Sequence, residues 1–198
     1  MENKHTHLVP EELEQLERLS LTDKHMKLQK SLDAFLFCCY AGMRYSDFTN
    51  LSKKNIVDIN QETWLIYKSV KTGTEVRLPL YLLFAGKGIV ILNKYRNNLE
   101  NFFRLRDNSN INKDLIIIAK LAGLSKKISF HTARHTNATL LIYNGVNITT
   151  VQKLLGHKSV KTTQVYTNIM DMTIVHDLEK IKQAALGIKK KTDNSFNK

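Results

Sequence analysis

The chain has 198 residues, of which 42% are hydrophobic, and its 30 Lys and Arg outnumber its 18 Asp and Glu, giving a net charge of +12. This length and apolar content suit one globular domain with a sizeable core. Such a positive excess favours a polyanionic partner, because each neutralised phosphate releases condensed counterions. No apolar run is long enough to span a membrane, and the polar start MENKHTH is unlike a signal peptide. The sequence therefore predicts a cytoplasmic protein without a membrane partner.

The cysteines and carboxylates give no sign of a disulfide or a metal site. Cys38 and Cys39 are adjacent inside an apolar helical pattern, so their side chains point in different directions. The acidic residues are scattered, whereas a Mg²⁺ site needs a cluster of carboxylates. We expect two small core residues in a reducing compartment, and neither a metal nor another cofactor.

Helices are predicted in the N-terminal part, after a linker-like segment of residues 1–10. Pro10 is a favourable first helical residue. The apolar face that follows consists of Leu13, Leu16 and Leu19. A second helix has apolar residues at helical spacing, namely Leu28, Leu32, Phe35 and Cys39. Gly42 is expected to end it, which places Arg44 just after a helix C-terminus. Ser46 is expected to cap a short helix that runs to Leu51.

After this short helix, the hydrophobic pattern of the sequence changes to the one typical of β-strands. The segments NIVDI, TWLIYKS and TEVRLPL are short and rich in β-branched and aromatic residues. Thr72 and Gly73 supply turn residues between the second and third segments, with Lys71 at the lip of that hairpin. The sequence thus predicts a small three-stranded antiparallel sheet in an α+β, mainly α, fold.

The C-terminal part returns to helical patterns. One helix is expected across about 88–105 and another across 113–122, closed by Gly123, with the polar link 106–112 as a loop. Ser129 is expected to cap a helix that ends near Gly145. Thr149 and Thr150 open the next, closed by Gly156, and Ser159 opens a helix that leads to Tyr166. A last amphipathic segment, 174–185, precedes a basic tail, 187–198, which is expected to be disordered.

Several residues in these patterns suit chemistry on a phosphodiester. Tyr166 would be a nucleophile once its proton is removed. Arg44 and Arg134 carry planar forks that match phosphate oxygens and keep their charge. His157 adds a donor next to Gly156, and His131 lies one helical turn from Arg134 and shares its face. Lys71 suits a general acid for the departing 5′ oxygen.

Four segments resemble, in their order along the chain, the catalytic signature of the tyrosine recombinases of the phage-integrase type. They are AGMRYSDF, SVKTG, HTARHT and LLGHKSVKTTQVYT. The resemblance implies a catalytic domain across 11–186 that forms a covalent 3′-phosphotyrosyl link through Tyr166. It assigns phosphate binding to Arg44, Arg134 and His157, proton transfer to His131 and Lys71, and a bracing role to Asp47, by orienting His131 or an arginine. Asn137 departs from the family, which more often has a bulky apolar residue there.

The same resemblance implies the partners. Double-stranded DNA is the expected substrate, and a tetramer on paired sites that is monomeric off DNA is the expected assembly, with accessory DNA-bending proteins as further partners. The reaction would serve the integration or excision of a mobile element. Family members usually carry a core-binding domain before the catalytic one, whereas this chain opens directly at linker-like residues, as a fragment or a short form would.

Alternatives remain open at this point. A type IB topoisomerase uses nearly the same residues, although those enzymes more often carry Lys where His131 stands. A non-catalytic DNA-binding domain is the alternative from another class. Taken singly, Arg44 would be a surface charge, and Tyr166 a core aromatic or a surface phenol. Lys71 or Lys68 would be a simple DNA backbone contact. The ordered set of six residues favours the enzyme.

Overall fold

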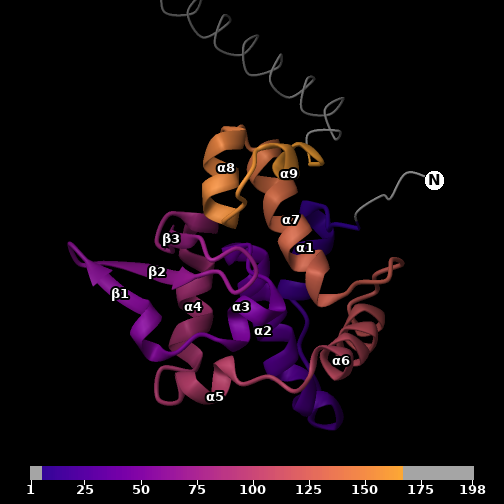
Figure 1. Cartoon of the computed structure of the whole chain (residues 1–198). Coiled ribbons are helices and arrows are strands. Elements are labelled where there is room, and N and C mark those ends of the chain that lie inside the picture. Colours follow the sequence, from indigo (N-terminus) through magenta and orange to yellow (C-terminus); the bar gives the residue numbers. More distant parts are fainter. Residues whose placement is uncertain (1–5, 167–198) are drawn as a thin grey trace, which may run out of the picture.

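The computed structural model describes residues 6–166; the amphipathic segment 174–185 and the tail 187–198 lie outside this range. The elements are α1 (Pro10–Glu17), η1 (Asp23–Leu28), α2 (Gln29–Ala41), α3 (Tyr45–Thr49), η2 (Lys53–Asn55), β1 (Ile56–Ile59), β2 (Glu62–Lys68), β3 (Glu75–Pro79), η3 (Leu83–Gly86), α4 (Lys87–Lys94), α5 (Leu99–Phe103), α6 (Asn108–Leu121), α7 (Phe130–Tyr143), α8 (Ile148–Leu155) and α9 (Lys161–Gln164). Helix α2 runs through the centre, with the sheet to one side and α6 and α7 to the other (Figure 1). The predicted class, mainly helical with a small sheet, is confirmed.

Helix α2 is the core of the molecule. Every residue from Ser31 to Ala41 is buried, because α4, α6 and α7 all pack against this helix. The apolar residues therefore occupy all of its faces, where the sequence had suggested one stripe. Phe37 meets Phe48 and Phe102 edge to face, with ring centroids 5.9 and 6.2 Å apart. This aromatic cluster ties α2 to α3 and α5.

The sheet is antiparallel and three-stranded, as predicted, and its strands lie in the order β1-β2-β3. Asn60 and Gln61, with φ of 53° and 67°, form the tight turn between β1 and β2. In β3, Val76 and Leu78 are buried and the alternate residue Arg77 is exposed. The sheet thus packs one face on the helices and ends with the β2–β3 turn beside the C-terminus of α8.

One predicted helix is in fact two. The segment 88–105 contains α4 and α5, separated by residues 95–98. Asn98 explains the break, since its side chain accepts a hydrogen bond from the backbone N–H of Asn101 at 3.1 Å and so caps a new helix. Before α4, Phe84 and Ala85 have positive φ of 48° and 53°, which hydrophobic periodicity could not indicate.

Helix α6 begins five residues earlier than predicted, at Asn108. Asp107 is its N-cap and accepts a hydrogen bond from the N–H of Asn110 at 3.0 Å. The prediction of a loop across 106–112 was therefore wrong for residues 108–112. The polar residues of this first turn face solvent, so the apolar pattern on which the prediction rested starts only at Ile111, which is buried.

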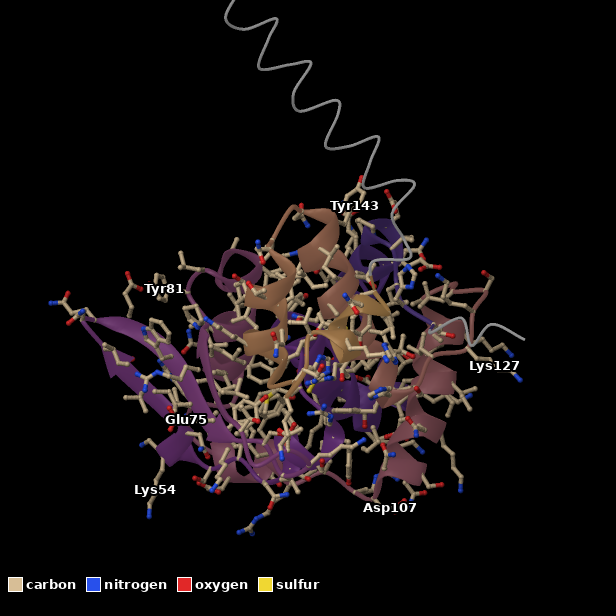
Figure 2. The ribbon with its side chains drawn as sticks, turned by 45° about the horizontal axis from the view of Figure 1, so that its top comes forward. Lys54, Glu75, Tyr81, Asp107, Lys127 and Tyr143 are labelled. Carbon is tan, nitrogen blue, oxygen red and sulfur yellow. The ribbon has the colours of Figure 1, made fainter. Side chains whose placement is uncertain are left out.

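The N-terminal residues from Leu8 onwards belong to the packed fold. Leu8 is fully buried, and its N–H donates to Thr136 Oγ1 at 2.9 Å. The division into a linker, a catalytic domain across 11–186 and a tail stays a prediction. Charged side chains such as Lys54, Asp107 and Lys127 point outwards around the rim (Figure 2). Among residues 6–166, no helix combines the length and the apolar character needed to cross a bilayer.

Candidate active site

Arg44 lies in the tight turn between α2 and α3. Gly42 ends α2 in the left-handed conformation, with φ of 66°, and Arg44 is the extended residue before α3. The prediction that Ser46 caps this helix was wrong, because the helix begins at Tyr45 and Ser46 lies inside it. The turn places the Arg44 side chain, which is 15% exposed, over the C-terminus of α2 and beside the β2–β3 turn.

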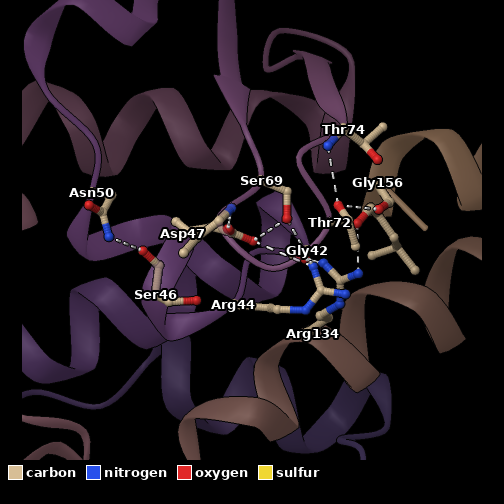
Figure 3. A network of polar contacts seen from close by, with 12 residues as sticks. Gly42, Arg44, Ser46, Asp47, Asn50, Ser69, Thr72, Thr74, Arg134 and Gly156 are labelled. Carbon is tan, nitrogen blue, oxygen red and sulfur yellow. Dashed lines mark hydrogen bonds and ion pairs between the residues drawn. The ribbon is translucent and has the colours of Figure 1, made fainter. Parts of the chain in front are cut away.

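Arg134 on α7 is fixed by backbone carbonyls. Its Nη1 donates to Gly42 O at 2.7 Å and its Nη2 to Leu155 O at 2.6 Å, so the guanidinium joins the C-termini of α2 and α8 (Figure 3). Burial, followed by the nearby charge of Arg44, lowers the pKa of Arg134 to about 10. The group is still a cation at neutral pH. Of its five N–H donors, those not used here are available to an anion.

Asn137, one helical turn beyond Arg134, reinforces this connection. Its Nδ2 donates to Cys39 O at 2.9 Å and to Tyr40 O at 3.0 Å, which are orphan carbonyls at the C-terminus of α2. The departure from the family pattern at Asn137 thus has a structural role that the sequence did not reveal. Both polar residues on this face of α7 hold the turn that carries Arg44.

Asp47 joins Arg44 to the β2–β3 turn. Its buried carboxylate accepts a hydrogen bond from the N–H of Val70 at 2.8 Å and lies 3.6 Å from Arg44 Nη1. Ser69 lies between them, since its Oγ donates to Asp47 Oδ2 and accepts from Arg44 Nη1, both at 3.4 Å (Figure 3). Asp47 therefore lies where it can orient Arg44, and its bracing role stays a prediction. Ser69 was not singled out from the sequence.

Lys71 lies in the β2–β3 turn, as predicted, and is exposed. The Ser69 N–H donates to Thr74 O at 2.9 Å, and the Gly73 N–H donates to Ser69 O at 2.8 Å. Thr72 Oγ1 donates to Gly156 O at 3.1 Å, which attaches the turn to the end of α8 (Figure 3). Lys71 is therefore held close to the residue that follows Gly156. Lys68, with which it could be confused in the sequence, lies at the end of β2.

His157 and Tyr166 follow α8 and α9. The backbone N–H of His157 donates to Gln152 O at 3.0 Å, and Gln152 Nε2 donates to His157 O at 3.1 Å. Burial and the charges of Arg134, Arg44 and Lys71 lower the pKa of His157 to about 4, so the ring is neutral at pH 7. Burial raises the pKa of Tyr166, while Arg134 and Arg44 act in the opposite direction.

Two histidines on α7, His131 and His135, form a series of ring contacts that ends at Tyr166. His131 is exposed in the first turn, and its ring lies edge-on to that of His135, with centroids 4.4 Å apart. The His135 ring lies 5.5 Å from that of Tyr166. His135 was not among the predicted site residues. Its spacing of four residues from His131 was the available signal, since such residues are neighbours on a helix face.

The predicted residues come from five separate segments and are linked by ring contacts and electrostatic interactions. His131 contacts His135, whose ring lies beside that of Tyr166. Arg44 and Arg134 act electrostatically on both Tyr166 and His157, and Lys71 acts on His157. Such an arrangement of cationic side chains suits the binding of an anion beside a phenol. Within residues 6–166, no three His, Cys, Asp or Glu side chains gather in a way that would hold a metal ion.

Comparisons with known proteins agree with this geometry. Residues 7–172 match the phage integrase family. A tyrosine recombinase of Pseudothermotoga lettingae is 30% identical over 89% of this chain and 60% of its own length. Tyrosine recombinase XerC of Rickettsia prowazekii is 30% identical over 76% of this chain and 49% of its own. The chain spans about half to three fifths of these curated relatives.

The fold is also that of a solved recombinase. The crystal structure of XerA recombinase matches with a TM-score of 0.68 and 24% identity, over 88% of this chain and 64% of the other. At that identity the likeness shows the fold alone, but the family match covers most of the chain, including the segments that carry Arg44, Lys71, Arg134 and Tyr166. The chain belongs to the phage integrase family.

Proposed function

We propose that this chain is the catalytic domain, across 11–186, of a site-specific DNA recombinase that cuts and rejoins DNA through a 3′-phosphotyrosine at Tyr166. The observation that carries the proposal is the environment of the Tyr166 phenol, where burial raises the pKa and the charges of Arg134 and Arg44 lower it by favouring the phenolate. The net charge of +12 supports a DNA substrate. The relatives named above are tyrosine recombinases, and their activity is the model for this proposal.

The scissile phosphate would lie between the two arginines and His157. Arg134 has its position set by the carbonyls of Gly42 and Leu155, so its remaining donors require little reorganisation when charge develops on the phosphate. Arg44 has the same advantage from Asp47 and Ser69. Each such donor contributes on the order of 10²–10³ in rate by analogy with oxyanion-hole donors.

Proton transfer requires a base for Tyr166 and an acid for the leaving oxygen. Tyr166 would attack the phosphorus and lose its proton towards the pair of His131 and His135. Lys71 would donate a proton to the departing 5′ oxygen, leaving a free 5′ hydroxyl and a phosphotyrosyl bond. Because that bond keeps the energy of the broken one, a 5′ hydroxyl from a second duplex can reverse the attack. No step requires a metal or a nucleotide.

The assembly follows from the stoichiometry of the reaction. Exchange between two sites cuts four strands, and each protomer offers one Tyr166, so four protomers act on paired sites. The protein would work in the cytoplasm, in the integration or excision of a mobile element and with accessory DNA-bending proteins. The isolated chain is expected to be monomeric off DNA.

Covalent capture tests the proposal without knowledge of the target site. The chain would be incubated with a library of nicked duplexes of random central sequence, in which a strand fragment diffuses away after cleavage and traps the adduct. We expect denaturation-resistant complexes that carry DNA on Tyr166. Tyr166→Phe should form none while binding DNA as well as the wild type, and Tyr81→Phe, a partly exposed tyrosine next to Trp64, should behave as the wild type.

Absence of any adduct with the wild-type chain would contradict the enzyme and favour a DNA-binding domain. If adducts do form, the DNA sequences captured from the library distinguish a recombinase from a type IB topoisomerase. A recombinase exchanges strands between two captured sites, whereas a topoisomerase relaxes supercoiled plasmid without a second site. Adducts on unrelated sequences, with relaxation and no exchange, would favour the topoisomerase.

A further inference from the structure

A threonine on α9 contacts the ring of His157. Thr163 Oγ1 and His157 Nδ1 are 2.9 Å apart, and both residues are buried, Thr163 completely. The other ring nitrogen, Nε2, makes no hydrogen bond within residues 6–166. Thr163 therefore contacts Nδ1 of the ring and leaves Nε2 available for a ligand.

The direction of this hydrogen bond determines which nitrogen carries the proton. In the part of the chain that the structure describes, the Thr163 hydroxyl has no other hydrogen-bond partner. If Nδ1–H donated to the threonine, the hydroxyl hydrogen would be buried without an acceptor, which proteins avoid. The favourable arrangement has the hydroxyl donating to the lone pair of Nδ1, and the ring proton is then on Nε2.

We infer that Thr163 is a positioning residue that holds neutral His157 as the Nε2–H tautomer, so that the ring donates a hydrogen bond to the scissile phosphate. The inference rests on the proposed function for the identity of that acceptor. The burial of the ring and the cations Arg44, Arg134 and Lys71 around it keep the ring neutral at pH 7. A neutral imidazole donates from one nitrogen only, so its tautomer decides whether it can stabilise the phosphate.

Thr163 also contacts the nucleophile's backbone. The N–H of Tyr166 donates to Thr163 O at 3.1 Å, so one residue holds His157 through its side chain and Tyr166 through its carbonyl. When α9 is in place, the donor and the nucleophile are oriented together. A displacement of α9 would remove both at once, whereas substitution of the side chain alone separates the two effects.

The tautomer can be measured directly on the free protein. ¹⁵N-labelled histidine would be incorporated into the full chain, and the His157 ring signals assigned by their loss in His157→Gln. In the wild type we expect a protonated Nε2 and an unprotonated Nδ1. Thr163→Val, which keeps the shape and removes the hydroxyl, should give a mixture of tautomers. Thr163→Ser should retain the wild-type pattern, as should Thr162→Val, an exposed neighbour on the same helix.

Cleavage of bound DNA provides the second readout. Thr163→Val should slow it by ~10²-fold, the loss expected for one donor to transition-state charge, with DNA affinity unchanged, and Thr163→Ser should restore most of the rate. A wild-type His157 protonated on Nδ1, or an unchanged tautomer in Thr163→Val, would overturn the inference. If the wild type forms no adduct with DNA, the proposed function fails, but the tautomer of the free protein still tests the role of Thr163.

Discussion

The carboxylate of Asp47 accepts a hydrogen bond from the N–H of Val70 at 2.8 Å, so an acid on α3 holds the residue that directly precedes Lys71. The same carboxylate lies 3.6 Å from Arg44 Nη1. Two groups with different proposed roles, the phosphate-binding Arg44 and the general acid Lys71, therefore share one buried anchor. A change at Asp47 should affect both.

Asp47→Ala should lower the free energy of unfolding by about 1–3 kcal/mol, because it leaves the Val70 N–H without its acceptor. It should also slow DNA cleavage far more than it weakens DNA binding. Asp47→Asn keeps an oxygen for Val70 but loses the charge opposite Arg44, so it should be closer to the wild type in stability than in cleavage. Urea unfolding and single-turnover cleavage would measure the two effects.

The matched control is Asp58→Ala, an exposed aspartate on β1. It should change the free energy of unfolding by less than about 0.5 kcal/mol and leave cleavage unchanged. If Asp47→Ala lost stability with normal cleavage of bound DNA, the anchor would be structural and without influence on the two catalytic groups.

Most of the elements could be predicted because their signals are local, and the six candidate site residues were selected from short motifs in their order along the chain. Gly42 and Gly156 end α2 and α8 in the left-handed conformation, and the alternation in β3 is visible in the sequence. The start of α6 could not be predicted in this way, since Asp107 and an exposed polar turn resemble a loop. Capping by a side chain decided that boundary, as it did the break before α5 at Asn98.

The residues that support the site could not be predicted from the sequence, for a different reason. Asn137 binds the carbonyls of Cys39 and Tyr40, and these are main-chain atoms that any residue would provide. The contact between Thr163 and His157 likewise depends on how the chain returns after α8. Sequence order indicated the candidates for the chemistry, but the residues that contact and orient them are defined only by the packed fold.

Gly42 should not tolerate a side chain. Its φ of 66° disfavours other residues, and a Cβ there would lie 2.6 Å from Asn137 Oδ1 and 2.8 Å from Leu155 Cδ2. Gly42→Ala should therefore cost about 1–2 kcal/mol for the left-handed backbone and a further ~1–3 kcal/mol for overpacking. It should also displace Arg44 and slow cleavage. Thermal or urea unfolding would measure the loss in stability.

Gly123→Ala separates these two costs. Gly123 has a similar φ of 76°, but a Cβ there would meet nothing within 4 Å. This variant should lose only the backbone part, about 1–2 kcal/mol, and should cleave DNA normally. Equal destabilisation by the two variants would show that Gly42 is needed only for its conformation and not for the close approach of Asn137.

The depressed pKa of His157 predicts a pH dependence of stability. Burial and nearby cations lower this pKa from 6.5 to about 4 in the folded protein. As the pH falls below about 6.5, His157 becomes protonated in the unfolded state but stays neutral in the folded state. The contribution of His157 to stability is therefore lost between about pH 6.5 and pH 4. Above about pH 7 this contribution is nearly constant.

Urea unfolding of the wild type and His157→Gln at several pH values would test this. The difference in free energy of unfolding between the two proteins should be constant above about pH 7 and should shift in favour of the variant as the pH falls towards 4. Taking the difference removes the contribution of the other titrating groups. A difference that does not vary with pH would show that His157 titrates as it does in the unfolded chain.

Lys71 should act through the leaving group. The β2–β3 turn holds it near His157, where its charge lowers the pKa of that ring, and Thr72 fixes the turn to Gly156. Lys71→Ala should therefore cleave a normal DNA strand at least ~10²-fold more slowly than the wild type, the lower part of the range for general acid catalysis. A 5′-bridging sulfur is a good leaving group without a proton, so Lys71→Ala should cleave that substrate nearly as fast as the wild type does.

Two controls make the sulfur test specific. Arg134→Ala removes a proposed phosphate contact and should remain slow on both substrates, because sulfur does not replace charge stabilisation on the non-bridging oxygens. Lys68→Ala, at the exposed end of β2, should cleave both at the wild-type rate. If Lys71→Ala were equally slow on oxygen and sulfur substrates, Lys71 would not be the general acid. Sulfur rescue of Lys68→Ala instead would transfer that role to the neighbouring lysine.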